Sequence, residues 1–337
     1  MDAEAQPDDA RIRLRAGLAS LIVAGLLLAA KYQAYRMTGS AAVLSDALES
    51  IVNVVAAVFA LGGLVFAGRP ADRNHPYGHG KIEFFSAAFE GGLIAFASVL
   101  VVYGALRSLI RGPEVRQIGV GILIVLASAL VNLALGVYLL RTGRRHRSLT
   151  LAADGQHVLA DVWTSGGIVL GLGLVNLTGW AWLDPVVALL VALWLMWTGF
   201  GLVRHAAGGL LDEEDPALLR RVLAALQRYL GNGIIRVHHL RAIRSGRFQH
   251  VEAHLVVPEF WSVERAHDLS EEVAARVMRD MGAEGEMVFH TDPCHRLYCA
   301  VCDLRDCPVR REPYRETTVM TLEEAVRPDL PRVAPGA

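Results

Sequence analysis

The first 293 residues of the chain contain no cysteine, and all four cysteines lie between positions 294 and 307. There is also no excess of charge, with 33 basic against 34 acidic residues, which removes the electrostatic case for nucleic-acid binding. No H-E-x-x-H motif occurs, and no nucleophile motif accompanies the acidic residues of the apolar segments, so we expect no enzyme. No cleavable signal peptide is predicted, because the first eleven residues are acidic rather than basic.

Long apolar segments dominate the first two thirds of the chain. Hydrophobic residues make up 53% of the sequence, which is high for a soluble protein, and nearly all long apolar runs fall between about 17 and 205. Each of six segments is long enough to cross a hydrocarbon core of about 30 Å as a helix. We place them near 14–35, 41–67, 84–110, 117–140, 151–176 and 181–204.

The basic residues between these segments predict the orientation in the membrane. One set of loops carries eleven Lys and Arg residues, and the opposite set carries five. Cytosolic loops are enriched in Lys and Arg. We therefore expect a multi-pass protein of the inner (plasma) membrane with both termini in the cytosol.

The remainder has the composition of a soluble domain. Its pattern predicts a helix from Asp215 through Leu230, strands at Ile234–Ile243 and Phe248–Val257, a helix at Ser262–Met281 and a strand at Glu286–His290. This is an αββαβ unit. The expected organisation is a cytosolic segment at 1–13, a six-helix transport domain at 14–210, a cytosolic domain at 211–293, a Cys-rich segment at 294–310 and a disordered tail at 311–337.

Polar side chains at bilayer depth are costly and mark ion paths or proton relays by default. Asn53 follows Glu49 by four residues on the second segment, and Asp161 follows His157 by four on the fifth. Each pair shares one helix face, about 6 Å apart. Two facing helices would offer four nitrogen and oxygen ligands, which suit borderline ions such as Zn²⁺, Fe²⁺ and Co²⁺.

Three further acidic residues lie in the apolar segments. Asp46 and Asp154 are each one turn nearer the end of their helix, and we interpret them as structural or access-path groups. Glu90 on the third segment receives no assignment.

Several of these motifs together resemble the cation diffusion facilitator family. They are Gly39-Ser40, the E/D-x-x-x-N/D spacing of Glu49 and Asn53, the loop from Pro70 to Glu83, and His157-x-x-x-Asp161. The resemblance covers residues from about 12 to 294. It implies a homodimeric divalent metal/proton antiporter with six transmembrane helices and a small cytosolic α+β domain of ferredoxin-like fold.

The resemblance also implies positions for the metal sites. The transport site falls on Glu49, Asn53, His157 and Asp161, where the bacterial zinc-exporting branch has Asp-x-x-x-Asp with His-x-x-x-Asp. Because an amide replaces one acid, the charge of the site falls from −3 to −2. A loop site falls on Asp72, His75 and His79, a binuclear cytosolic site on His238, His254, His267, His290 and Asp292, and a structural charge pair on Lys81 and Asp212.

The family resemblance does not explain the Cys-rich segment. Cys294, Cys299, Cys302 and Cys307 lie within fourteen residues, a density that favours a metal site over free thiols. A zinc ion is favoured over an iron–sulfur cluster.

Two function classes stay open beside proton-coupled efflux of a divalent metal. One is a transport-silent, metal-binding partner of another carrier, which Asn53 keeps open. The other, less favoured, is an intramembrane metalloenzyme. Zn²⁺ is the favoured exported ion and Fe²⁺ the second choice. Mn²⁺ and Co²⁺ are also candidates, because selectivity among these ions depends on the coordination geometry of the site.

Overall fold

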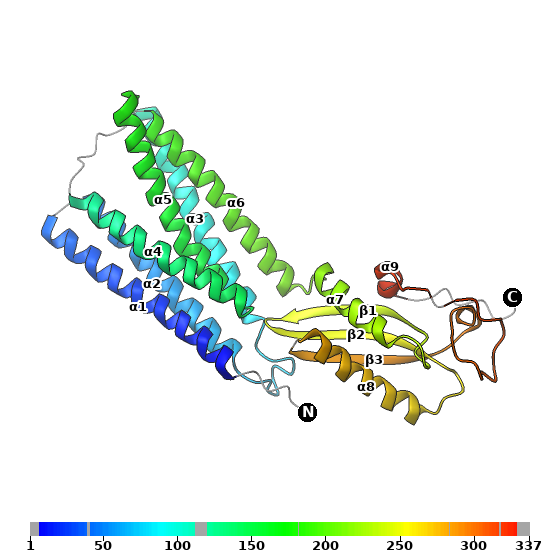
Figure 1. The fold of residues 1–337 in the computed structure, drawn as a ribbon. Coiled ribbons are helices and arrows are strands. Elements are labelled where there is room, and N and C mark those ends of the chain that lie inside the picture. The colour runs from blue at the N-terminus through cyan, green and yellow to red at the C-terminus, as the bar shows by residue number, and fades with distance from the viewer. Residues whose placement is uncertain are drawn as a thin grey trace. The chain divides into compact units, whose positions relative to one another are not determined.

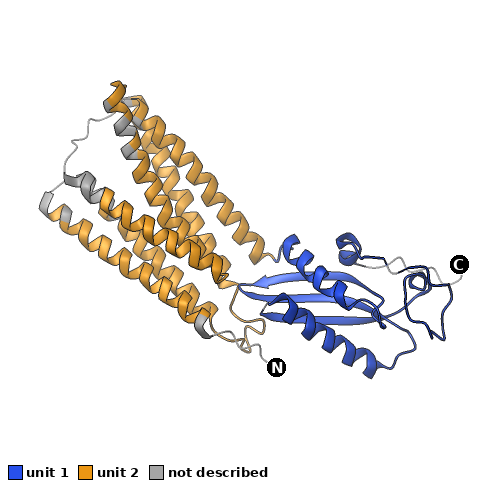
Figure 2. Cartoon of the chain, viewed as in Figure 1, with its two compact units in different colours: residues 1–3, 212–337 blue, residues 4–211 orange. Residues whose placement is uncertain are grey.

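The computed structural model describes residues 7–38, 41–111, 120–180, 182–282, 284–316 and 318–328. The Gly39-Ser40 motif lies outside these ranges, and within them the side chains of some helical residues, Asp46 and Glu49 among them, lie outside the description. The chain divides into two compact units, residues 4–211 and residues 212–337 together with 1–3 (Figure 2). Each unit has its own core.

The first unit is a bundle of six long helices (Figure 1). They are α1 (Pro7–Thr38), α2 (Ala41–Ala67), α3 (Ile82–Arg111), α4 (Val120–Arg145), α5 (Leu149–Thr178) and α6 (Leu183–Leu210). α1 packs along α2, α3 along α6, and α4 along α5. The six predicted segments are therefore confirmed as helices, most of them longer at one or both ends than the sequence indicated.

Among the described residues, five of these helices are long and apolar enough to cross a membrane, namely α1, α2, α3, α4 and α6. The other, α5, is thirty residues long and carries Asp154, His157 and Asp161. Charged residues at bilayer depth are rare and face the interior of a bundle when they occur. On α5, accordingly, Asp154 and His157 are buried and Asp161 is partly buried.

Close helix contacts in this unit rest on glycine. A Cβ added to Gly199 of α6 would lie 2.8 Å from the carbonyl oxygen of Gly91 on α3. A Cβ added to Gly155 of α5 would lie 2.7 Å from the backbone nitrogen of Leu140 on α4. Small residues allow membrane helices to approach this closely, and α3 is thereby held beside α6 and α5 beside α4.

The second unit is the predicted αββαβ domain. It contains α7 (Pro216–Leu226), a 3₁₀ turn η1 (Gln227–Tyr229), β1 (Arg236–Ser245), β2 (Phe248–Val257), α8 (Val263–Met281) and β3 (Gly285–Pro293). The sheet order is β1-β2-β3, with β1 antiparallel and β3 parallel to β2. The first helix ends four residues earlier than predicted, because the chain tightens into η1.

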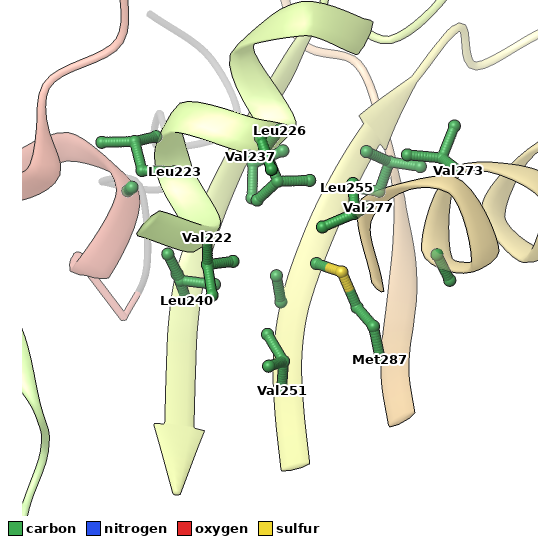
Figure 3. Close-up of a cluster of buried hydrophobic side chains, with 14 of the residues drawn as sticks. Val222, Leu223, Leu226, Val237, Leu240, Val251, Leu255, Val273, Val277 and Met287 are labelled. Carbon is green, nitrogen blue, oxygen red and sulfur yellow. The ribbon is translucent and has the colours of Figure 1, made fainter. Parts of the chain in front are cut away.

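The core of this domain lies between the helices and one face of the sheet. Val222 and Leu226 of α7 and Val277 of α8 contribute to it from the helices. They meet Leu240 and Leu255 of the sheet (Figure 3). Successive side chains of a strand point to opposite faces. The face that α7 and α8 do not cover consequently carries His238, His254, His290 and Asp292.

The expected disordered tail after residue 310 needs correction. Its described part contains a short helix, α9 (Leu322–Val326), which starts with a capping box between Thr321 and Glu324. Met320 and Ala325 are fully buried in the domain core, and the backbone nitrogen of His239 donates to the carbonyl of Arg327 at 2.8 Å. These contacts fix the segment because it buries apolar surface, whereas residues 329–337 lie outside the described residues.

Candidate metal sites

Helices α2 and α5 bring three of the four predicted transport ligands together. The amide nitrogen of Asn53 donates a hydrogen bond to Asp161 Oδ2, and His157 Nε2 lies 3.2 Å from Asn53 Oδ1. His157 is buried, and Asn53 and Asp161 are partly buried. The i, i+4 spacing on α5 therefore does place His157 and Asp161 on the face that meets α2.

The fourth predicted ligand, Glu49, is on α2 one turn before Asn53. Its side chain and that of Asp46 lie outside the description, so their roles stay predictions. Asp154 on α5 is buried and hydrogen-bonds to Ser20 of α1. That contact agrees with a structural role for Asp154 at the boundary between α1 and α5.

Glu90 of α3 is the residue that sequence reasoning left unassigned. It is fully buried, and its Oε2 lies 3.7 Å from His157 Nδ1. Among the described residues, neither carboxylate oxygen of Glu90 has a hydrogen-bond partner, and nor does His157 Nδ1. A buried carboxylate without a partner is costly, and this one points at the imidazole of the candidate site. In the sequence, the one feature that could have pointed to Glu90 is the position of this acidic residue within a long apolar segment.

The loop between α2 and α3 brings Asp72, His75 and His79 together. One potential ligand atom from each lies within 4.8 Å of the others. Asp72 Oδ1 accepts from the backbone nitrogens of His75 at 2.8 Å and Asn74 at 2.9 Å, and Asp72 Oδ2 lies 3.3 Å from His79 Nε2. The backbone hydrogen bond from His75 is the main cause that lowers the pKa of Asp72. Asp72 is thus held as a carboxylate facing two imidazoles, a donor set that suits a divalent metal.

The sheet of the second unit brings together His238, His254 and Asp292, again with ligand atoms within 4.8 Å of one another. His238 of β1 pairs with His254 of β2, which pairs with His290 of β3. Asp292 Oδ2 lies 2.9 Å from both His238 Nε2 and His254 Nδ1, and Asp292 Oδ1 lies 3.4 Å from His290 Nε2. Partial burial opposes ionisation of Asp292, but the hydrogen bonds and charges of His254 and His238 outweigh it and lower its pKa.

His290 thus borders this cluster through Asp292, whereas His267, the remaining predicted ligand of this domain, lies apart from it. It is exposed on α8, and α8 packs against the opposite face of the sheet. Its role as a ligand stays a prediction. His239, which the sequence did not single out, occupies a β-bulge with φ of 51°, and its ring centroid lies 4.8 Å from that of His254.

The remaining predicted residues are placed as follows. The four cysteines are free thiols that line one cavity at the C-terminal end of β3. Burial raises the pKa of the Cys294 thiol. Lys81 and Asp212 belong to different compact units, and their pairing stays a prediction.

Comparison with known proteins matches both units to described families. Residues 17–211 match the cation efflux transmembrane domain, and residues 215–294 match the cytoplasmic domain of cation efflux proteins. The second match ends at the first cysteine of the Cys-rich segment.

Two relatives align over most of the chain. A protein of Synechocystis described as an uncharacterised transporter is 39% identical over 248 residues, which cover 73% of this chain and 80% of that protein. The cation-efflux pump FieF of Escherichia coli is 27% identical over 284 residues, which cover 84% of this chain and 94% of the pump. The pump of Shigella flexneri aligns over the same shares.

Proposed function

Because the chain belongs to the cation diffusion facilitator family, whose members are multi-pass membrane proteins for cation efflux, we propose that it exports a divalent transition metal in exchange for protons. The exported ion enters from the cytosol and leaves across the inner membrane. Zn²⁺ is the first candidate, and Fe²⁺ is the second. Both termini lie in the cytosol, in keeping with the basic residues of the loops.

The observation that carries this proposal is the contact between His157, Asn53 and Asp161 across α2 and α5. Carboxylate oxygen, imidazole nitrogen and amide oxygen converge there inside the bundle. The hydrogen bond from Asn53 to Asp161 occupies a position that a metal ion would take over. Binding turns the amide so that its oxygen, rather than its nitrogen, faces the ion, since only the oxygen is an electron-pair donor.

Glu90 belongs to the same site. With Glu49 and Asp161 it supplies a third carboxylate, which compensates for the acid that Asn53 replaces. Its position beside His157 Nδ1 lets it either bind the ion or orient the imidazole that does. The site is then formed by three helices rather than two.

Proton coupling follows from the chemistry of the ligands. Imidazole and carboxylate bind a metal only when deprotonated, so binding on the cytosolic side releases protons. Protonation of His157 and a carboxylate on the outer side expels the ion. Movement of α2 and α5 relative to their neighbours supplies alternating access.

The loop and cytosolic clusters bind metal without transporting it. Metal at His238, His254 and Asp292 joins the three strands on the open face of the sheet. Two copies of the chain pair as a homodimer through this domain, and the metal draws the two domains together.

Transport by the purified chain in proteoliposomes tests the function. When a pH gradient is imposed, wild-type protein is expected to move Zn²⁺ in the direction opposite to the protons, and His157→Ala is expected to abolish this movement. His205→Ala serves as the matched control, because His205 is an exposed histidine of α6. Retained transport in His157→Ala would refute the site. Absence of transport by the purified wild-type chain would favour the alternative that it is a metal-binding partner of another carrier.

A further inference from the structure

All four cysteines of the chain line one cavity of about 80 Å³. They come from a segment that follows β3 and turns through η2 (Arg296–Tyr298). The backbone nitrogen of Cys294 donates to Val257 at 2.8 Å, which ties the first cysteine to the end of β2. None of the four forms a disulfide. The fold therefore gathers every thiol of the chain at one place.

A single side chain closes the loop around this cavity. The guanidinium of Arg310 donates to the carbonyl oxygens of Cys299 at 2.9 Å and Cys302 at 3.1 Å, and also to Leu304. Cys302 and Tyr298 are buried against Ile235 in an apolar cluster separate from the main core of the domain. This cluster is small, and segments that bury so little commonly need a metal or a disulfide to hold them.

The spacing of the thiols favours a polynuclear cluster over a single ion. A tetrahedral zinc ion with Zn–S bonds of about 2.3 Å holds its sulfurs roughly 3.8 Å apart. Among the described residues, only the loop and sheet clusters bring three ligand atoms within 4.8 Å of one another, so no three of these thiols are that close. In an iron–sulfur cluster the four thiolates are divided among two or four iron atoms, so no three of them converge on one metal and the inorganic core holds them further apart.

The charges around the cavity agree with a bound anion. Its lining includes Arg296, Arg310 and Arg311 against one carboxylate, that of Glu259. Four thiolates carry more negative charge than the small positive charge of an iron–sulfide core neutralises, and arginine guanidinium groups are well suited to compensate the remainder.

We propose that Cys294, Cys299, Cys302 and Cys307 hold an iron–sulfur cluster, in place of the single zinc ion that their spacing in the sequence favours. The cluster binds at the cytosolic domain, outside the transport site and outside the His238, His254 and Asp292 cluster. It fixes the segment after β3 against the sheet. This inference does not depend on which ion the membrane domain exports.

The full chain, purified in detergent without oxygen, tests the proposal. We expect iron and acid-labile sulfide in equal amounts, at ~2 or ~4 of each per chain, with the visible absorption of a thiolate-ligated cluster and an electron paramagnetic resonance signal in one redox state. Zinc at ~1 per chain without sulfide would overturn it. So would four thiols that all react with an alkylating reagent in protein free of sulfide.

Variants separate this centre from the other metal sites. Cys307→Ala is expected to lose the sulfide and the visible absorption, and Cys307 is only partly buried, so its loss disturbs the apolar cluster less than loss of Cys302 would. Sulfide at the wild-type level in Cys307→Ala would contradict the proposal. Asp161→Asn is the control: it is expected to lose transport while it keeps the full sulfide content, so failure of the transport assignment and failure of the cluster assignment give different results.

Discussion

Replacing Glu90 with glutamine removes one negative charge from the candidate transport site and changes little else, because the two side chains have the same shape. Glu90 is fully buried, and the described residues offer its oxygens no hydrogen-bond partner that glutamine would lose. The substitution therefore isolates the electrostatic contribution of this carboxylate to metal binding.

The expected size of the effect follows from the distance to His157. Glu90 Oε2 lies 3.7 Å from His157 Nδ1, and two unit charges about 4 Å apart interact by about 4 kcal/mol at an effective dielectric constant of 20. A divalent ion bound to the other ring nitrogen, Nε2, lies further from Glu90 but carries twice the charge. We expect a loss of about 2–4 kcal/mol, which corresponds to roughly 30- to 700-fold in affinity.

Metal-dependent uptake into proteoliposomes measures this change as an increase in KM. The increase should be largest for ions that prefer oxygen ligands, such as Mn²⁺ and Fe²⁺. Glu83→Gln is the matched control, because Glu83 is another buried glutamate of α3 but pairs with Arg13 outside the site; it should lower stability while the folded protein keeps its KM. A KM of Glu90→Gln within about threefold of the wild type for every ion, well below the range that the Coulomb interaction predicts, would refute the reasoning.

Three further predictions concern stability and packing. Glu83→Gln removes the charge opposite the buried Arg13 and should destabilise the bundle by about 3–5 kcal/mol, seen as a lower Tm in detergent. Gly199→Leu should separate α3 from α6 at a cost of about 1–3 kcal/mol and reduce transport, whereas Gly201→Leu should not, since a Cβ there meets nothing within 4 Å; equal losses would argue against the close contact. Asp292 has a pKa below its ordinary 3.8, so its stabilising contribution is present above that value and is lost as pH falls through the lowered pKa. Acid unfolding of Asp292→Asn should accordingly be less steep than that of the wild type, and identical profiles would contradict the assigned contacts.

Sequence periodicity predicted the parts of the transport site that depend on a single helix. The four-residue spacing of His157 and Asp161 places both side chains on one face of α5, and the structure shows that this face meets Asn53. The contribution of Glu90 depends on which third helix packs beside α5. α3 is positioned there in part by α6, through contacts such as Gly91 with Gly199. These contacts involve residues about a hundred positions apart and leave no local pattern.

In the second unit, too, local features were predicted from the sequence and features that depend on distant residues were not. Alternation in Phe248–Val257 predicted β2 with both of its ends, and Asp215 marked the start of α7. The bulge at His239 was not predicted, because it follows from pairing with β2 rather than from the residues of β1. α9 was missed although the capping-box pattern of Thr321 and Glu324 was present, since five helical residues carry too little periodicity to be recognised.

The most direct test of the central claim is the exchange of metal for protons by the purified wild-type chain. In vesicles with a trapped pH-sensitive dye, addition of Zn²⁺ should move protons in the direction opposite to the metal, and collapse of the pH gradient should stop metal accumulation. Asp161→Asn should show neither flux. Metal flux that proceeds equally with and without a pH gradient, or that survives in Asp161→Asn, would contradict the account.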